Sequence, residues 1–279
     1  MKITDSHIHF WQPGTLSYPW LGDVPAINKP YLPQGLPASG DGWEMEKLVF
    51  VQADCIPEQG LDEVTWVTEL SENDPRIQGI VAFAPLENDN FHDTVEVLGS
   101  NPLVKGVRRL IQSEPQGFAV QEHFVRAVNT LAHYALTFDI CVLHYQLPDA
   151  IALVRQCPNV TFVLDHLGKP NIKDGEIDEW KANIDALAAL DHVHCKISGM
   201  VTEADLQNPQ QSDLQPYVDH VLEVFGVHRL MFGGDYPVLE LASTTYPQWV
   251  SMSFKLLDGL SDDEKARVFS ENANAFYGL

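Results

Sequence analysis

The sequence lacks the features that mark membrane-spanning and secreted chains. It has no run of about 18 apolar residues, which is the length that a membrane-spanning helix requires. The chain also passes from Met1 and Lys2 directly into an alternating pattern, without the apolar segment of a secretory signal. These absences exclude a membrane-spanning protein and lead us to expect a cytoplasmic one.

Cysteine and positive charge are also scarce. The four cysteines form no CxxC pair, which indicates free buried thiols in a reducing compartment rather than disulfides or a thiolate metal site. Only 17 lysine and arginine residues stand against 39 aspartate and glutamate residues, for a formal net charge of −22. This charge repels phosphate backbones and anionic membranes, so we expect neither nucleic acid nor a membrane as a partner.

The remaining composition is that of a globular protein with a full core. The chain is 45% hydrophobic and 20% charged. Its 279 residues are many for one compact domain, but an α/β barrel typically needs about 250 residues. We therefore expect a single domain over residues 1–279.

Short β-branched runs alternate with helical patterns along most of the chain. The expected strands are 2–8, 48–52, 77–83, 104–111, 137–144, 160–164, 194–197 and 229–232. The expected helices are 61–73, 91–98, 121–135, 148–156, 179–190, 214–225, 246–257 and 261–277. In the last helix, Ser261 and Glu264 form a capping box.

This alternation predicts a parallel sheet, and eight strand–helix units close naturally into a (β/α)8 barrel of the TIM type. A doubly wound open sheet is the alternative, but no GxGxxG follows an early strand to support a dinucleotide site.

A long segment, 13–43, follows the first strand. It has five prolines after Pro13 and little periodicity, and such loops are usually functional or disordered. Its large aromatic side chains argue against disorder, because apolar rings tend to be anchored. We expect a long first βα loop that covers whatever His7 and His9 face. A surface excursion that packs its rings on the barrel rim is the alternative.

The first strand carries two histidines. Its period of two places Asp5, His7 and His9 on one face. Two neutral imidazoles on one side of a strand end can bind one divalent metal or donate hydrogen bonds to one substrate oxygen. A pair of histidines near a mobile terminus, without a site, is the alternative interpretation.

In a barrel of this kind, active-site residues lie at the C-terminal ends of the strands. Polar residues do occupy those positions here: His7 and His9; Gln52 and Asp54; Arg108 and Arg109; His144 and Gln146; Asp165 and His166; Lys196 and Ser198; and Asp235. The other histidines fall in helices, loops or strand starts, and we expect them to be surface or structural residues: His92, His123, His133, His192, His194, His220 and His228.

The chain also contains seven motifs, in order and over nearly its whole length: DSHIHFW, YPWL, GVRRLIQ, FVLDHLGKP, CKISGMVTEAD, RLMFGGDYPV and ENANAFY. Together they resemble the amidohydrolase superfamily, and in detail its lactonase branch of the L-fuconolactonase and L-rhamnonolactonase type. The resemblance implies a hydrolase of carbohydrate metabolism that opens a sugar (aldono-) lactone to the aldonic acid. It also implies a mononuclear or metal-free centre, because Arg108 and Arg109 follow the fourth strand and no carboxylated lysine does.

Four residues are the expected catalytic group. Asp235, which follows two glycines, is the expected general base for water, with a capping role in the GGDYP turn as the alternative. His7, His9 and His166 either hold one divalent ion such as zinc, together with Asp235, or donate to the developing oxyanion. An already reactive lactone needs a metal far less than an amide does, so we expect the metal to be dispensable.

Arg108, Arg109, His144 and Gln146 are candidate substrate-binding residues. Arg108 and Arg109 are adjacent on a strand, so only one of them can point inward, where it can bind a carbonyl or a carboxylate. His144 and Gln146 share a strand face, and the sequence leaves open which of them faces the centre.

Four further substrate contacts are candidates. Lys196 and Ser198 can reach ring hydroxyls, with an interior ion pair as the alternative for the lysine. Trp11 and Trp20 can stack on a sugar ring or simply pack. Two neighbouring side chains are expected elsewhere: Asp165 facing away from His166, and Lys169 on the surface.

Three classes of function are thus open. The leading one is a hydrolase acting on a small neutral sugar lactone, the one partner that the sequence indicates. The second is a metal-dependent decarboxylase or amide hydrolase of the same superfamily. The third is a non-catalytic binding protein on the barrel scaffold.

Overall fold

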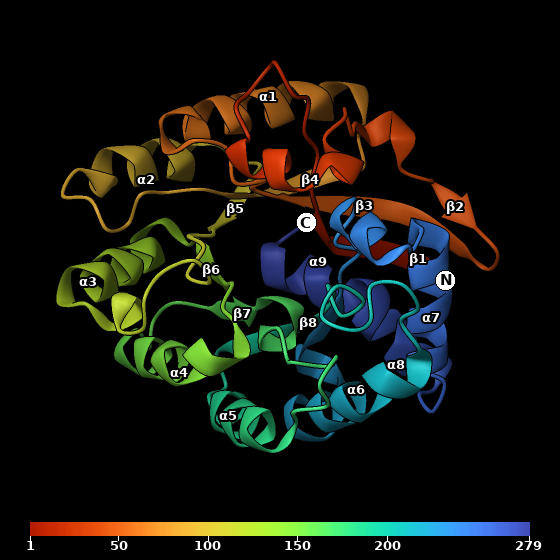
Figure 1. The fold of residues 1–279 in the computed structure, drawn as a ribbon. Coiled ribbons are helices and arrows are strands. Elements are labelled where there is room, and N and C mark those ends of the chain that lie inside the picture. The colour runs from red at the N-terminus through yellow and green to blue at the C-terminus, as the bar shows by residue number, and fades with distance from the viewer.

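A computed structural model describes residues 1–279 and shows eight parallel strands in a ring, surrounded by helices (Figure 1). The strands follow one another in chain order around the sheet: β1 (Lys2–Ile8), β3 (Trp43–Val51), β4 (Ile77–Ala82), β5 (Val104–Val107), β6 (Thr137–Ile140), β7 (Phe162–Leu164), β8 (Val193–Ile197) and β9 (Leu230–Phe232). A short strand, β2 (Ser39–Gly40), pairs antiparallel with the start of β3. The predicted (β/α)8 barrel is confirmed.

The first and last strands meet where the ring closes. The amide of His9 donates to the carbonyl of Tyr236 at 2.8 Å, and the amide of Asp235 donates to the carbonyl of His7 at 2.8 Å. Residues from opposite ends of the sequence are therefore neighbours at the C-terminal edge of the barrel.

Six helices connect successive strands on the outside of the ring, and a seventh, α7 (Tyr246–Leu256), follows β9. The six are α1 (Gly60–Asn73), α2 (Phe91–Ser100), α3 (Glu122–Thr130), α4 (Leu147–Gln156), α5 (Asp178–Ala188) and α6 (Gln211–Phe225). None of the helices has the length and apolarity that crossing a bilayer requires.

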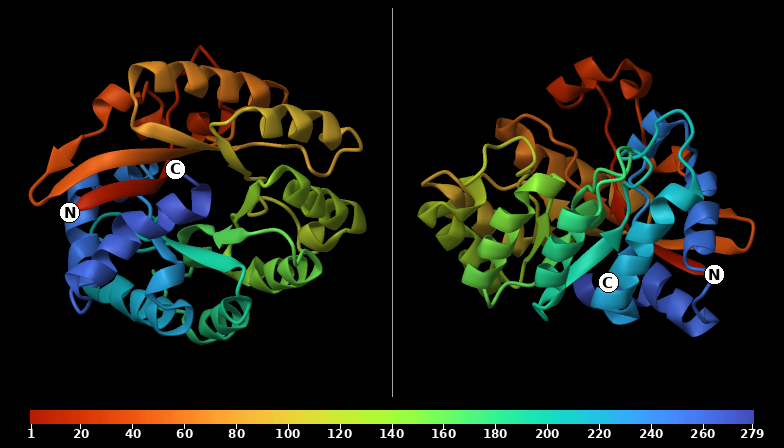
Figure 2. Two further views of the ribbon diagram at one scale, coloured as in Figure 1. Left: turned by 180° about the vertical axis from the view of Figure 1, so that it is seen from behind. Right: turned by 60° about the horizontal axis from the view of Figure 1, so that its bottom comes forward.

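The C-terminal segment differs from the single helix expected over 261–277. It consists of α8 (Asp262–Ala266), a π-helical stretch (Arg267–Glu271) and α9 (Asn272–Tyr277). Seen from behind, α9 lies across the end of the barrel at which β1 begins (Figure 2). The expected capping box is present, since Ser261 Oγ accepts from the Glu264 amide and the Glu264 carboxylate accepts from the Ser261 amide.

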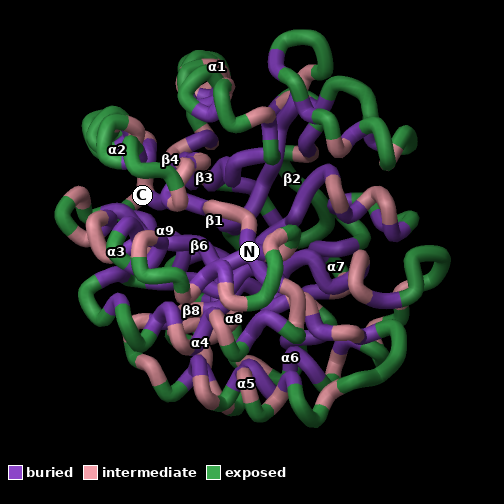
Figure 3. The backbone as a smooth tube through the Cα atoms, turned by 60° about the vertical axis from the view of Figure 1, so that its left-hand side comes forward, coloured by how far each residue is buried: buried purple, intermediate pink, exposed green.

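The core has the burial pattern of a parallel barrel. Residues 48–51 of β3 are all buried, because the ring interior covers one face of the strand and helices cover the other. The helices expose their outer sides, as α1 and α2 show in Figure 3. The four cysteines are free and buried, as expected: Cys55, Cys141, Cys157 and Cys195.

Two strands end earlier than predicted. β5 ends at Val107 rather than at 111, and β6 ends at Ile140 rather than at 144. Beyond these ends the amides of Ile111 and Gln112 both donate to the carbonyl of Cys141, at 3.0 and 3.1 Å. The regular hydrogen-bond pattern between β5 and β6 therefore stops, and two amides share one carbonyl. The residues expected at the end of β6 consequently lie in a 3-10 turn, His144–Gln146.

The long first βα loop is ordered. It contains three short 3-10 helices, Pro19–Asp23, Pro25–Ile27 and Pro33–Gly35, each begun by a proline. Trp11 and Tyr31 exchange backbone hydrogen bonds of 3.0 and 2.8 Å and are both buried. The expectation that aromatic rings anchor this loop is confirmed.

Candidate active site

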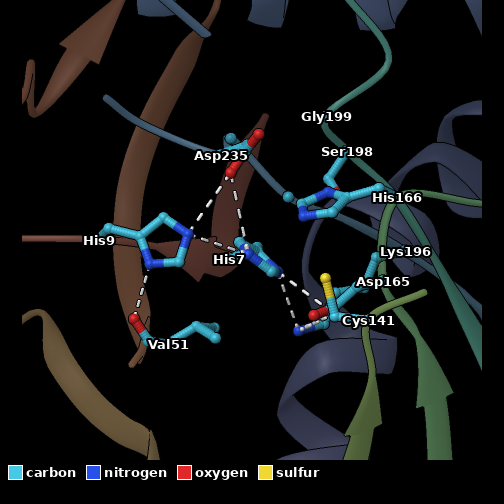
Figure 4. A network of polar contacts seen from close by, with 12 residues as sticks. His7, His9, Val51, Cys141, Asp165, His166, Lys196, Ser198, Gly199 and Asp235 are labelled. Carbon is cyan, nitrogen blue, oxygen red and sulfur yellow. Dashed lines mark hydrogen bonds and ion pairs between the residues drawn. The ribbon is translucent and has the colours of Figure 1, made fainter. Parts of the chain in front are cut away.

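Three polar side chains meet where β1 and β9 end (Figure 4). The Nε2 atoms of His7 and His9 lie 3.2 Å apart. Asp235 Oδ1 lies 3.5 Å from His9 Nε2 and 3.9 Å from His7 Nε2. All three residues are buried, and their polar atoms are close enough to share one small ion. The structure thus brings together three of the four expected catalytic residues.

The backbone around this centre is held by Asp5. Its Oδ1 accepts from the amides of His7 (2.9 Å) and Gly234 (2.8 Å), and its Oδ2 accepts from the Tyr246 hydroxyl (2.7 Å). A Cβ on Gly234 would lie 2.4 Å from Asp5 Oδ2, so only glycine fits there. Asp5 therefore fixes the strand of the histidines against the segment that leads to Asp235.

The fourth residue, His166, reaches the centre through an unusual turn after β7. His166, Leu167, Gly168 and Lys169 all have positive φ, from 48° to 72°. The ring of His166 lies 4.4 Å from that of His7 between centroids, and its Nδ1 is 2.9 Å from Ser198 Oγ. Left-handed backbone costs an L-residue roughly 1–2 kcal/mol, so it persists only where the surroundings hold it.

The expectation that Asp165 faces away from His166 is wrong. Adjacent side chains alternate only on a strand, and β7 ends at Leu164. In the left-handed turn both side chains reach the barrel centre, where Asp165 Oδ1 lies 3.3 Å from His7 Nδ1. Asp165, His166 and His7 form a second group whose polar atoms are close enough to share an ion.

A buried ion network supports the centre from below. Lys196 Nζ lies 2.5 Å from Asp139 Oδ2 and 3.0 Å from Asp165 Oδ1. Tyr277 donates to Asp139 Oδ2 at 2.9 Å, and Arg108 Nη1 lies 3.2 Å from Asp165 Oδ2. Burial opposes these charges, but the two carboxylates hold the pKa of Lys196 above its usual value. Two cations and two anions balance one another here.

The hydrogen bonds assign the neutral tautomer of His9. The carbonyl of Val51, 2.7 Å from His9 Nδ1, can only accept, so His9 Nδ1 carries the hydrogen and Nε2 is bare. His7 has a donor-only cation at each ring nitrogen, since Arg108 Nη1 lies 3.3 Å from Nε2 and Lys196 Nζ lies 3.3 Å from Nδ1, where Asp165 Oδ1 also lies at 3.3 Å. The bare Nε2 of His9 and the carboxylate oxygen of Asp235 therefore face one another with no hydrogen between them.

The same environment sets the charges of these groups. Burial lowers the pKa of His7, of His9 and of His166, the last to about 4. Burial alone would raise the pKa of Asp235, but the adjacent His166, His9 and His7 hold it below its usual value. At neutral pH the centre is thus an ionised carboxylate among neutral imidazoles, which is the state that a general base requires.

A cavity of about 250 Å³ opens over this centre. It leaves the centre open to a small molecule, and its wall comes from the strand ends and from the long first loop. The lining residues are His9, Trp20, Ala53, Asp54, Arg108, Leu110, Gln112, Ser113, Cys141, His166, Lys169, Thr202, Asp235 and Val238. A larger surface depression, of about 810 Å³, lies over α2 and α3 and includes none of the expected catalytic residues.

The structure separates the two adjacent arginines. Arg108 is buried and lines the cavity, with Nη2 donating to the Gln52 carbonyl at 2.6 Å and with Nε unpartnered. Arg109 lies outside the cavity lining, and its guanidinium donates to Glu87 at 2.9 and 2.7 Å and also pairs with Glu114. Arg108 is therefore the inward one.

Neither His144 nor Gln146 lines the cavity. Gln146 is buried, accepting from the Leu143 amide at 3.0 Å and donating to the Ile111 carbonyl at 3.0 Å, so it organises the turn. His144 is partly exposed, with Nε2 3.9 Å from Glu176 Oε2. Because β6 ends early, the residue after that strand that reaches the cavity is Cys141.

Of the other substrate-binding candidates, one lines the cavity and three do not. Trp20 lines the cavity and donates from Nε1 to the Ala53 carbonyl at 2.9 Å. Trp11 is fully buried and donates to the carbonyls of Ile27 and Lys29, so the structure places it in the packing of the loop. Lys196 and Ser198 are fully buried below the cavity, the lysine in the ion network and the serine against His166.

Sequence reasoning missed several residues that matter here. Lys169 lines the cavity, so its expected surface position is wrong. Asp139 had a usable signal, since a carboxylate within an apolar strand needs a buried cation and Lys196 was the obvious partner. Nothing in the sequence pattern connects Tyr277 to the barrel interior.

Comparison with known proteins gives consistent results. A family model described as "Amidohydrolase" matches residues 4–279. The chain is 33% identical over 288 residues to a protein of Burkholderia multivorans named L-fucono-1,5-lactonase, covering 99% of this chain and 95% of that one. It is 30% identical over 280 residues to a protein of the same name from Burkholderia ambifaria, with the same coverage of both chains. Among solved structures, an amidohydrolase from B. multivorans with bound zinc shares 32% identity and a TM-score of 0.90, over 100% of both chains.

Proposed function

Because this chain belongs to the amidohydrolase family and is a hydrolase of cyclic esters, we propose that it opens a neutral aldonolactone to the aldonic acid, with Asp235 as the base. The single observation that supports this best is an ionised carboxylate among neutral imidazoles, at the floor of a cavity of about 250 Å³. A cavity of that size suits one sugar ring. The B. multivorans and B. ambifaria relatives, named as L-fucono-1,5-lactonases, support a sugar lactone.

The proposed reaction uses one water and one base. Asp235 accepts a proton as the water oxygen bonds to the lactone carbonyl carbon, which gives a tetrahedral intermediate. The bond from that carbon to the ring oxygen then breaks, and the ring oxygen takes the proton from Asp235. The products are the hydroxyl and carboxyl groups of the open acid, and the base is regenerated.

Arg108 is the proposed partner of the carbonyl oxygen. It is a buried cation whose side chain lines the cavity. A fixed positive charge beside developing negative charge stabilises the transition state more than the ground state. Its Nη1 and Nη2 are held by Asp165 and the Gln52 carbonyl, which fixes the position of the group.

The centre also fits a divalent metal. The bare Nε2 of His9 and the Oδ1 of Asp235 face one another at 3.5 Å without a hydrogen between them, and His7 Nε2 lies 3.2 Å from His9 Nε2, an arrangement that a cation relieves. These three residues would hold the ion, with His166 as the fourth ligand proposed. Zinc bound there would polarise the carbonyl and lower the pKa of water.

Removing metal is expected to leave most of the activity, because Arg108 already supplies positive charge to the carbonyl of a reactive ester. Extensive dialysis against a chelator should change kcat by only a small factor, measured by proton release. The same samples, analysed for metal by atomic emission, show whether the ion was removed. Complete loss of activity, restored by one equivalent of zinc, would instead establish a metal-dependent hydrolase.

The pH dependence follows from the lowered histidine pKa values. Because His166 has a pKa of about 4, it is neutral at higher pH and takes up a proton as the pH falls. We therefore expect kcat/KM, corrected for uncatalysed opening, to be constant from about pH 6 to about pH 8 and to fall about tenfold per unit below pH 4. A fall centred near pH 6.5, the value of an ordinary histidine, would contradict this assignment.

The substrate class is tested with a panel of lactones. Two carboxylates, Asp54 and Asp235, line the cavity against two cations, and one of these, Arg108, is already paired with Asp165. Lys169 is then the one cation left for a dianion, which needs several, so the site disfavours such a substrate. We expect kcat/KM for L-fucono- or L-rhamnono-type lactones to exceed that for a pyrone dicarboxylate by at least about tenfold. A tenfold preference for the dicarboxylate would reverse the proposal.

A further inference from the structure

We propose that Asp54 and Lys169 form a hydroxyl-recognition pair at the mouth of the cavity, binding ring hydroxyls of the substrate from opposite sides. Neither residue belongs to the catalytic centre, and both line the cavity. The inference rests on the proposed lactonase function, because the recognised hydroxyls are those of the sugar ring.

The barrel places the two side chains opposite one another. Asp54 follows β3 and Lys169 follows β7. In the strand order β1-β3-β4-β5-β6-β7-β8-β9, these two are four positions apart in a ring of eight. A sugar ring bound over Asp235 therefore has the Asp54 carboxylate on one side and the Lys169 ammonium on the other.

Both side chains keep free hydrogen-bonding capacity. Lys169 Nζ has one charged neighbour, Glu203 Oε1 at 4.0 Å, which is beyond hydrogen-bond distance. The Asp54 carboxylate takes part in none of the ion pairs of the structure. An ammonium has three donors and a carboxylate has only acceptors, so together they can satisfy both roles of a sugar hydroxyl.

Both residues have left-handed backbone, which is uncommon for residues other than glycine. Asp54 has a φ of 59° and Lys169 a φ of 48°. Lys169 follows Gly168, where a Cβ would lie 2.8 Å from Leu147, so the turn has little freedom to re-aim the lysine. Strained backbone of this kind concentrates at ligand-binding positions, where the surroundings maintain it.

Glu203 orients the lysine. Its side chain is only 22% exposed and lies on the segment that also contributes Thr202 to the cavity. Burial raises the pKa of Glu203, and the Lys169 ammonium opposes that rise. The attraction to Glu203 thus favours one position of the Lys169 side chain on the cavity wall, while its N–H donors remain available to a ligand.

The proposed pair should discriminate between lactones that carry ring hydroxyls and lactones that lack them. A net-neutral pair of one donor and one acceptor group matches a neutral polyhydroxylated ring, and it gives no advantage to a lactone without hydroxyls. A site built to bind a hydroxyl rejects analogues that lack it more strongly than an apolar site would.

The test compares a hydroxylated aldonolactone with unsubstituted δ-valerolactone. In Lys169→Met and Asp54→Asn, kcat/KM for the aldonolactone should fall by about 10- to 100-fold, mostly through KM, as expected for losing one charge-assisted hydrogen bond. The value for δ-valerolactone should stay within about twofold of the wild type. Lys173→Met and Asp62→Asn are matched controls, since both residues are exposed and lie outside the cavity lining.

Two kinetic results would overturn the proposal. Equal losses on both lactones would place the residues in the catalytic or structural machinery, and no loss on either would remove them from substrate contact. A binding measurement separates this proposal from the proposed function. If the wild type opens no lactone, calorimetric titration with the aldonolactone decides, because binding that both variants weaken supports the pair, and absence of binding refutes it.

Discussion

Asp235→Asn is expected to lower kcat by about two to four orders of magnitude while the protein stays folded. The substitution keeps the shape of the side chain but removes the carboxylate that the neighbouring histidines hold in its ionised form. The amide cannot accept a proton from water at neutral pH, so the attack loses its base. Turnover of the best lactone from the panel measures the loss.

Circular dichroism and the denaturation midpoint serve as the folding control for this variant. Asp89→Asn is a matched substitution, since Asp89 is exposed on the far depression over α2 and α3. A folded Asp235→Asn protein with near wild-type turnover would remove Asp235 from the reaction.

Lys196→Met is expected to lower the free energy of unfolding by about 3–5 kcal/mol, which is the usual cost of breaking a buried ion pair. The methionine fills most of the space but leaves Asp139 and Asp165 buried without their shared cation. Arg108 then remains as the one cation paired with Asp165. Urea denaturation, followed by tryptophan fluorescence, measures the change.

Two further variants give this prediction its controls. Lys2→Met removes the pair with Glu46, in which the lysine side chain is 68% exposed, and should leave the free energy of unfolding nearly unchanged. Asp139→Asn combined with Lys196→Met removes a charge of each sign and should recover part of the loss. If Lys196→Met costs no more than Lys2→Met, the network is not the support that we infer.

The fold was predictable because the relevant signals are local. Strand periodicity, β-branched runs and the capping box at Ser261 are all set by neighbouring residues, and the eight-strand barrel follows from their alternation. The strand-end rule also placed His7, His9 and Asp235 near one another, as the structure has them.

The parts that could not be predicted depend on where strands stop. Sequence reasoning extended β6 to His144, whereas the strand ends at Ile140, and this moved the predicted contact from Cys141 to His144 or Gln146. Likewise, the side-chain alternation assumed for Asp165 fails because its backbone has left the strand.

A second group of residues is set by tertiary packing alone. The left-handed turn that directs His166 and Lys169 exists because its surroundings impose it, for example through Trp180, whose Nε1 donates to the Leu167 carbonyl at 2.8 Å. No local propensity favours such a turn at non-glycine residues. The contact of Tyr277 with Asp139 likewise joins segments that no periodicity connects.

The closure of the strand ring between β1 and β9 also affects the order in which the protein folds. His7 and His9 are made first and Asp235 much later, and the hydrogen bonds that join them link opposite ends of the sequence. Contacts so distant along the chain are the slowest to form, because the intervening loop must lose its entropy first. The helices and the middle strands can assemble from nearby partners, whereas the centre exists only once the two ends have met. After dilution from denaturant, catalytic activity would then recover more slowly than the helical signal in circular dichroism. The rate at which activity returns would measure the last step of folding.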